Sequence, residues 1–286
     1  NITGARLWFK CENFQKVGAF KFRGATNAVI NLTDEQRRRG VVTHSSGNHA
    51  AALAHAAVSR GVKAFIVMPS TAPEVKKRAV AGYGAEITFC EPTLEAREAA
   101  AASIISRTGA TLIHPYDNYY IIAGQGTAAL ELLTDQPSLD AIIAPVGGGG
   151  LLSGTSITAR HLMPSIKIYG AEPLLADDAA RSLHTGTLQP PLKPLSIADG
   201  LLTALSERTF TVIREKVDDI LTVSEEAIIE AMMLVWERMK IVIEPSSATA
   251  FAIVLANKEL FARKNVGIII SGGNVDMRNL PFSRLS

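Results

Sequence analysis

The chain has 286 residues, of which 47% are hydrophobic and 20% charged, and its formal net charge is +2. This size and apolar content suit a soluble globular protein with one large domain or two smaller ones. Because acidic and basic residues are interleaved, we expect no partner of nucleic acid and no membrane surface.

Short β-branched or apolar runs alternate along the chain with longer alanine-rich runs. We predict strands at residues 40–44, 63–69, 85–90, 140–146, 167–173, 218–223 and 266–270. We predict helices at residues 47–60, 72–84, 93–109, 151–163 and 225–239. This alternation indicates strand-helix-strand units and a parallel sheet, so the fold class is α/β. The proline-rich stretch 188–198 is expected to be a surface loop.

The cysteines and the hydropathy bear on the compartment. Cys11 and Cys90 have no CxxC spacing and form no framework of bridges, which fits a reducing, cytoplasmic setting. No apolar run reaches the length of about 20 residues that a bilayer requires, and no leader pattern opens the chain. The chain begins a few residues before an apolar strand-like run, so we expect an upstream segment to be missing.

Lys21 lies between Phe20 and Phe22 in the stretch GAFKFRGA. A lysine in an apolar pocket loses hydration, which lowers the pKa of its amine and makes that amine a usable nucleophile or base. The alternative is that Lys21 begins an amphipathic helix and extends to water while the phenylalanines pack below it. These eight residues by themselves favour the alternative.

Polar turns that contain glycine follow three of the predicted strands, within residues 40–49, 142–154 and 267–276. Ligands of open parallel sheets bind beyond the carboxyl ends of the strands, so these turns could converge on one crevice. The second turn holds Gly147, Gly148, Gly149 and Gly150. Their bare N–H groups, with the positive end of a helix expected from Leu151, predict a phosphate site, although a tight turn without a ligand is the alternative.

The other two turns add polar groups. Residues 45–49, SSGNH, offer hydroxyls, an amide and an imidazole, although Ser45 or Ser46 could equally cap the following helix. Residues 271–274, SGGN, offer another hydroxyl at a strand end. The spacing matches neither GxxxxGK[ST] nor GxGxxG. A lysine, a phosphate site and a polar turn able to bind a carboxylate together suit pyridoxal phosphate, which needs a Schiff-base lysine and a phosphate anchor.

These residues resemble the β-family, or fold type II, of pyridoxal-phosphate enzymes, and within it the serine racemase and serine/threonine dehydratase group. The resemblance covers nearly the whole chain, with segments such as KCENFQKVGAFKFRGA, THSSGNHAAALAHAA, PVGGGGLLSG, LVWERMKIVIEPS and SGGNVD in the expected order. It implies two open parallel-sheet domains with helices on both faces, as in the tryptophan synthase β-like fold. A large domain would comprise residues 1–39 and 118–286, and a small domain at 40–117 would close over the active site.

The resemblance also implies roles for the cofactor residues. Lys21 would form the Schiff base, Phe20 would pack beside the cofactor ring, and Asn48 would hydrogen-bond its phenolic oxygen. Gly147, Gly148, Gly149 and Gly150 would hold the phosphate. Ser271 would face the pyridine nitrogen, and a neutral hydroxyl there favours elimination because it does not favour a protonated ring.

The implied activity is that of a dehydratase, or ammonia-lyase, which converts serine, threonine or 3-hydroxyaspartate to a 2-oxo acid and ammonia. The alternative is an enzyme that is primarily a serine racemase, with Lys21 and Ser46 acting on opposite faces of the substrate. The residues that would contact substrate are Ser45, Ser46, His49, Arg97 and Thr203. Arg97 could equally be a solvated helix arginine. A non-catalytic binding protein and a β-replacement enzyme are further alternatives.

Glu172, Asp178 and the carbonyl of Ala176 match a divalent-metal site of racemase-type members. Oxygen ligands of this kind suit magnesium, calcium or manganese. The alternative is that Asp177 and Asp178 only favour a helix N-terminus. A homodimer is implied, and nucleotide activation stays open. Tyr116 and Leu202 depart from the racemase pattern, which leaves the preferred substrate undecided.

Overall fold

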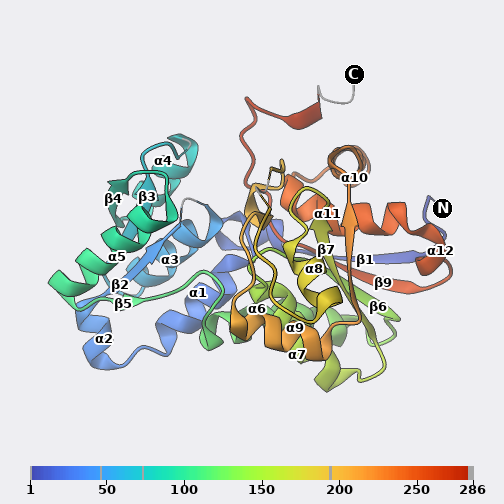
Figure 1. The fold of residues 1–286 in the computed structure, drawn as a ribbon, viewed down its shortest axis with the longest axis horizontal. Coiled ribbons are helices and arrows are strands. Elements are labelled where there is room, and N and C mark those ends of the chain that lie inside the picture. The colour runs from blue at the N-terminus through green and yellow to red at the C-terminus, as the bar shows by residue number, and fades with distance from the viewer. Residues whose placement is uncertain (1, 46, 73, 193–194, 283–286) are drawn as a thin grey trace. The chain divides into compact units, whose positions relative to one another are not determined.

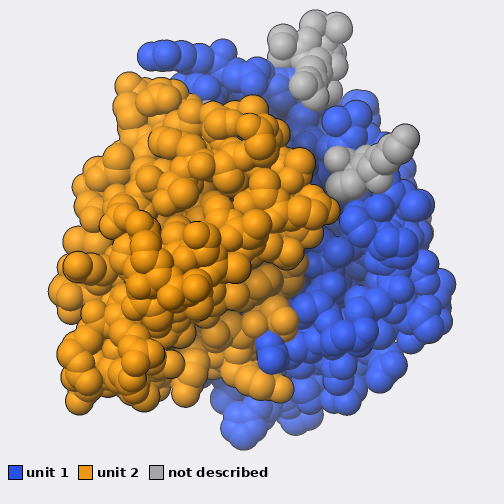
Figure 2. Space-filling view, turned by 60° about the vertical axis from the view of Figure 1, so that its left-hand side comes forward, with its two compact units in different colours: residues 1–20, 125–286 blue, residues 21–124 orange. Residues whose placement is uncertain are grey.

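The computed structural model describes residues 2–45, 47–72, 74–192 and 195–282. The chain divides into two compact units, which are residues 1–20 with 125–286 and residues 21–124 (Figures 1 and 2). This division places residues 21–39 and 118–124 in the smaller unit. The sequence-based boundaries, residues 1–39 with 118–286 and residues 40–117, refer to a domain that closes over an active site. They stay a prediction.

The larger unit is built on a five-stranded sheet whose neighbouring strands are all parallel. In spatial order the strands are β1 (Arg6–Cys11), β9 (Asn265–Ile270), β6 (Ala141–Pro145), β7 (Lys167–Pro173) and β8 (Asp219–Val223). The chain runs outward from β6 through β7 to β8 and returns with β9 on the other side of β6. The strand order therefore reverses between β6 and β9, which is where open sheets of this type bind ligands.

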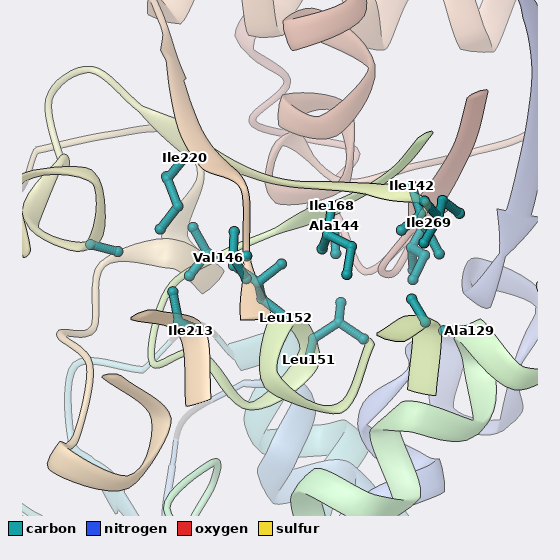
Figure 3. Close-up of a cluster of buried hydrophobic side chains, with 14 of the residues drawn as sticks. Ala129, Ile142, Ala144, Val146, Leu151, Leu152, Ile168, Ile213, Ile220 and Ile269 are labelled. Atoms are coloured by element: carbon teal, nitrogen blue, oxygen red, sulfur yellow. The ribbon is translucent and has the colours of Figure 1, made fainter. Parts of the chain in front are cut away.

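Helices cover both faces of this sheet, and their side chains form two buried clusters. Ile142 and Ala144 of β6 belong to one cluster with residues of α7 (Gly150–Leu162), as Figure 3 shows. Ala141 and Ile143 of the same strand belong to the other cluster. Burial on both faces explains why the strand is a continuous apolar run rather than an alternating one. The remaining helices of this unit are α8 (Asp178–Thr185), α9 (Glu207–Lys216), α10 (Glu225–Met239), α11 (Pro245–Ala256) and α12 (Lys258–Phe261).

The smaller unit contains a four-stranded parallel sheet. In spatial order the strands are β4 (Glu86–Cys90), β3 (Ala64–Pro69), β2 (Val41–His44) and β5 (Thr111–Leu112). The order reverses here too, because β3 and β4 lie on one side of β2 and β5 lies on the other. The helices are α1 (Lys21–Ile30), α2 (Asp34–Arg39), α3 (Asn48–Val58), α4 (Glu74–Gly82) and α5 (Leu94–Thr108), while α6 (Tyr119–Asp135) continues into the larger unit.

The predicted α/β class with parallel sheets is confirmed. Each predicted strand and helix is present, with ends that differ by a few residues; α7, for example, begins at Gly150 instead of Leu151. The described part of the 188–198 loop holds no regular element before residue 199. Within the described residues, no helix combines the length and the apolar character that a bilayer crossing needs.

Candidate active site

The four glycines lie at the reversal point of the larger sheet, between the end of β6 and the start of α7, and all four are buried. A Cβ on Gly147 would lie 2.9 Å from the Cα of Leu201 and 3.2 Å from the hydroxyl of Thr203. Gly149 has a φ of 85° and precedes α7 without a side-chain cap. Gly147 and Gly149 thus leave no room for a side chain, and the N–H groups of the first turn of α7 are available to an anion.

Ser271 follows β9 on the other side of the reversal and is 3% exposed. The turn that it begins is bonded to the segment directly before Lys21. The N–H of Phe20 donates to the carbonyl of Ser271 at 2.9 Å, and the N–H of Gly273 donates to the carbonyl of Gly18 at 2.9 Å. Backbone bonds therefore hold this segment against the end of β9.

Lys21 is the first residue of α1 and is half-buried. Its Nζ donates to the carbonyl of Pro115 at 2.9 Å. The predicted helix start at Lys21 is confirmed, but the amine is bonded to a carbonyl in the segment that follows β5 rather than simply extended to water. Lys21 and the residues after β2 and β5 belong to the same unit.

His49 lies in the first turn of α3 and is 2% exposed. Its Nε2 is 3.0 Å from the carbonyl of Ile113. Since a carbonyl only accepts, Nε2 carries the proton and Nδ1 is a bare acceptor, which is buried without a hydrogen-bond partner. Burial first, and then the charge of Lys21, lower the pKa of His49 to about 3. The imidazole is therefore neutral at physiological pH.

Ser45, Ser46 and Asn48 are the other polar residues of the turn between β2 and α3. The hydroxyl of Ser45 accepts from the N–H of Gly47 at 3.3 Å, and α3 has Gly47 as its N-cap, so Ser45 does not cap the helix. Asn48 is the first residue of α3 and is half-exposed. Ser46 lies outside the described residues.

Of the two remaining candidates for substrate contact, Arg97 is half-buried on α5, and its Nε donates to the carbonyl of Thr93 at 3.2 Å. Burial, and next the charge of Arg97, lower the pKa of His44. Thr203 is exposed and, as noted, adjoins Gly147 in the larger unit.

Glu172 and Asp178 form a pair of buried carboxylates, each 1% exposed. The oxygens of Glu172 accept from the N–H groups of Ala179 at 3.0 Å and Ala180 at 2.8 Å, and burial raises the pKa of Glu172 to about 8. Neither carboxylate oxygen of Asp178 has a hydrogen-bond partner, and burial raises its pKa also. Asp177 instead pairs with Arg181 at 2.8 Å.

In the part of the chain that is described, no three or more His, Cys, Asp or Glu side chains group as metal ligands. The candidate set therefore rests on two carboxylates and the carbonyl of Ala176, which is buried. A buried carboxylate without a hydrogen-bond partner is costly unless a cation or a proton compensates it.

Comparison with known proteins identifies the family. The sequence profile of the family described as pyridoxal-phosphate dependent enzyme matches residues 1–272. The chain belongs to this family. It is 55% identical over 283 residues to the serine racemase of Dictyostelium discoideum, a match that covers 98% of this chain and 87% of that protein. It is 51% identical over 276 residues to the L-threo-3-hydroxyaspartate ammonia-lyase of Saccharomyces cerevisiae, covering 96% and 85% respectively.

The fold of this pyridoxal-phosphate dependent enzyme also matches solved structures. The crystal structure of the Dictyostelium discoideum serine racemase superposes with a TM-score of 0.92, covering 96% of this chain and 90% of that one. The fold type II architecture is thus confirmed. The glycine turn fits a phosphate group, because it is buried, carries no side chains and leads into α7, whose N-terminus lacks a side-chain cap.

Sequence reasoning missed Ser247, which is fully buried on α11 and bonded to Ser271. The stretch EPSSA gives no local indication that Ser247 bonds to Ser271, because Ser271 lies 24 residues further along the chain. Only the packing of α11 beside the end of β9 brings the two serines together.

Proposed function

We propose that the chain is a pyridoxal-phosphate-dependent ammonia-lyase of β-hydroxy amino acids. It converts serine, threonine or 3-hydroxyaspartate to a 2-oxo acid and ammonia. The observation that carries the proposal is the buried glycine turn opposite Ser271 at the reversal between β6 and β9. A hydroxyl at the end of β9, where a carboxylate would favour a protonated ring, supports elimination.

Residues from several parts of the chain would hold the cofactor. Lys21 would hold it covalently through Nζ, Phe20 would pack beside its ring and Asn48 would donate to its phenolic oxygen. Gly147, Gly148, Gly149 and Gly150 would bind its phosphate through backbone N–H groups. When bound, the cofactor supplies an electron sink that makes the Cα proton of an amino acid acidic.

The chain's own residues then move protons and orient the substrate. The amine of Lys21 would take the Cα proton from one face of the bound substrate. The Cα–H and Cβ–O bonds would break, and the Cα proton and the hydroxyl would leave together as water. The released enamine would tautomerise and take up one water to give the 2-oxo acid and ammonia. Ser45, the neutral imidazole of His49, Arg97 and Thr203 are the proposed substrate contacts.

A racemase activity is the second candidate, and the 55% identity to a serine racemase favours it. The hydroxyl of Ser46 would give or take the Cα proton on the face opposite Lys21. The variant Ser46→Ala distinguishes a racemase from an ammonia-lyase. It should lower the turnover of D-serine and the rate of racemisation far more than the rate of elimination from L-serine. Equal losses in all three rates would count against two bases on two faces.

Further proposals follow from the resemblance and the buried carboxylates. Glu172, Asp178 and the carbonyl of Ala176 would hold magnesium, calcium or manganese, which would neutralise Asp178 and stabilise the larger unit. We also propose that the protein forms a homodimer and is located in the cytoplasm.

The proposed function predicts that Lys21→Ala abolishes the visible absorption band of the bound cofactor and lowers keto-acid release about 100-fold or more. Keto-acid release should be measured on L-serine, D-serine, L-threonine and L-threo-3-hydroxyaspartate, while chiral chromatography follows the remaining substrate. Lys63→Ala, at an exposed lysine of the same unit, is the control and should change neither property. A normal cofactor band in Lys21→Ala would refute the assignment of Lys21.

A further inference from the structure

Ser247 lies in the first turn of α11 and is 0% exposed. Its hydroxyl oxygen is 2.9 Å from the hydroxyl oxygen of Ser271. The same oxygen is 2.6 Å from the backbone nitrogen of Gly272 and 2.6 Å from its carbonyl oxygen. Ser247 thus contacts the first two residues of the turn that follows β9.

The donors and acceptors of this cluster allow two arrangements. The N–H of Gly272 can only donate, so the oxygen of Ser247 accepts there in both. In the structure the hydroxyl of Ser247 donates to the carbonyl of Gly272 at 2.6 Å. That carbonyl also accepts from the N–H of Glu244 at 3.1 Å, so it keeps one bond when the proton of Ser247 turns away. In one arrangement Ser247 donates to this carbonyl and Ser271 donates to Ser247. In the other, the proton of Ser247 turns from the carbonyl to Ser271.

The second arrangement frees the proton of Ser271 for a ligand. The N–H of Gly272 then donates to Ser247, Ser247 donates to Ser271, and Ser271 donates outward. In such a chain each acceptor becomes a stronger donor, because the bonds polarise one another. The positive end of α11 adds to this effect, since Ser247 lies in its first turn.

We propose that Ser247 is a positioning residue that orients the Ser271 hydroxyl and strengthens it as a donor to the ring nitrogen of pyridoxal phosphate. This inference rests on the proposed function, in which Ser271 faces that nitrogen. Its consequence is that the hydroxyl of Ser271 has a buried partner both before and after the cofactor binds. The cofactor then binds without leaving that hydroxyl unsatisfied, which would cost free energy.

A double-mutant cycle tests the role of Ser247. Apoprotein is prepared for the wild type, Ser247→Ala, Ser271→Ala and the double variant, and each is titrated with pyridoxal phosphate to obtain a dissociation constant. We expect Ser247→Ala to raise this constant about fivefold when Ser271 is present, the effect of one hydrogen bond. In the Ser271→Ala background the same substitution should have no effect beyond about 1.5-fold, because the coupling is lost.

A second readout reports on the nitrogen itself. With cofactor labelled with ¹⁵N in the ring, Ser247→Ala should move the nitrogen resonance toward that of a ring nitrogen without a donor. Thr249→Val is the matched control, because it removes another buried hydroxyl of α11, which donates to the carbonyl of Pro245 at 3.1 Å. It should leave the resonance in place.

The outcomes separate the inference from the proposed function. Equal losses of affinity in both backgrounds, or an unmoved resonance in Ser247→Ala, would overturn the role of Ser247 and indicate only a packing effect. Thermal unfolding of each apoprotein shows whether a variant has folded before it is titrated. A wild-type chain that binds no pyridoxal phosphate would overturn the proposed function and this inference with it.

Discussion

At the scale of single residues, burial decides which groups of the candidate site carry a charge. His49 cannot gain a proton without breaking its bond to Ile113 or charging a buried nitrogen, so it stays neutral as the pH falls. In the unfolded chain the same imidazole titrates near its ordinary pKa of 6.5. The unfolded state therefore binds more protons than the folded state between these two pKa values.

This difference predicts acid sensitivity with a defined sign. Lowering the pH from 7 to 5 should reduce the free energy of unfolding by about 2 kcal/mol through His49 alone. His49→Gln should lose that part of the dependence, as measured by urea unfolding at both pH values. His161→Gln, at an exposed position of α7, is the control and should keep it. A His49→Gln variant that remained as acid-sensitive as the wild type would contradict the account.

At the scale of elements, the glycine turn shows how a helix start depends on what surrounds it. Gly149 has a φ of 85°, and a Cβ there would lie 2.7 Å from a methyl carbon of Leu205 and 2.8 Å from the Cβ of Thr209. Gly186, which ends α8, has a φ of 72° and nothing within 4 Å of such a Cβ. The two glycines share the backbone strain and differ in the contact.

This pair predicts unequal costs for the same substitution. Gly186→Ala should lower the free energy of unfolding by about 1 kcal/mol, which is the cost of a left-handed alanine. Gly149→Ala should lower it by about 3 kcal/mol, because overpacking adds to that cost, and should weaken cofactor binding. Urea unfolding and cofactor titration of both variants measure these effects. Equal destabilisation by both substitutions would mean that the atoms around Gly149 move aside freely.

At the scale of the whole molecule, the two units have separate sheets, and each sheet reverses its strand order once. In the larger unit the buried carboxylates lie where β7 leads into α8, and neither carboxylate oxygen of Asp178 has a hydrogen-bond partner among the described residues. A divalent cation bound there would stabilise the folded chain by mass action.

Magnesium at about 100 times its dissociation constant should therefore raise the midpoint of thermal unfolding by about 5 °C over a chelated sample. Asp178→Asn should remove this rise, while its midpoint without metal should equal or exceed that of the wild type, because a buried unpartnered carboxylate is gone. Asp177→Asn is the matched control and should keep the rise, since Asp177 pairs with Arg181. If both variants lost the rise equally, the carboxylates would act only as charges at a helix end.

The sequence by itself determined the α/β class, the positions of most strands and helices, and the family. Local patterns suffice for these, because β-branched runs, alanine-rich runs and glycine turns act over a few residues. Lys21 and Gly147 to Gly150 could be singled out for the same reason, since their chemistry is visible in adjacent letters.

Only the tertiary structure decided which strands are neighbours. Strands β6 and β9 are far apart in the sequence, and a crossover can return to either side of a parallel sheet, so no local pattern places Ser271 beside the glycine turn. The bond between Ser247 and Ser271, the unpartnered carboxylate of Asp178 and the neutral imidazole of His49 arise in the same way. Each depends on desolvation and on contacts between distant segments, which exist only after the chain has packed.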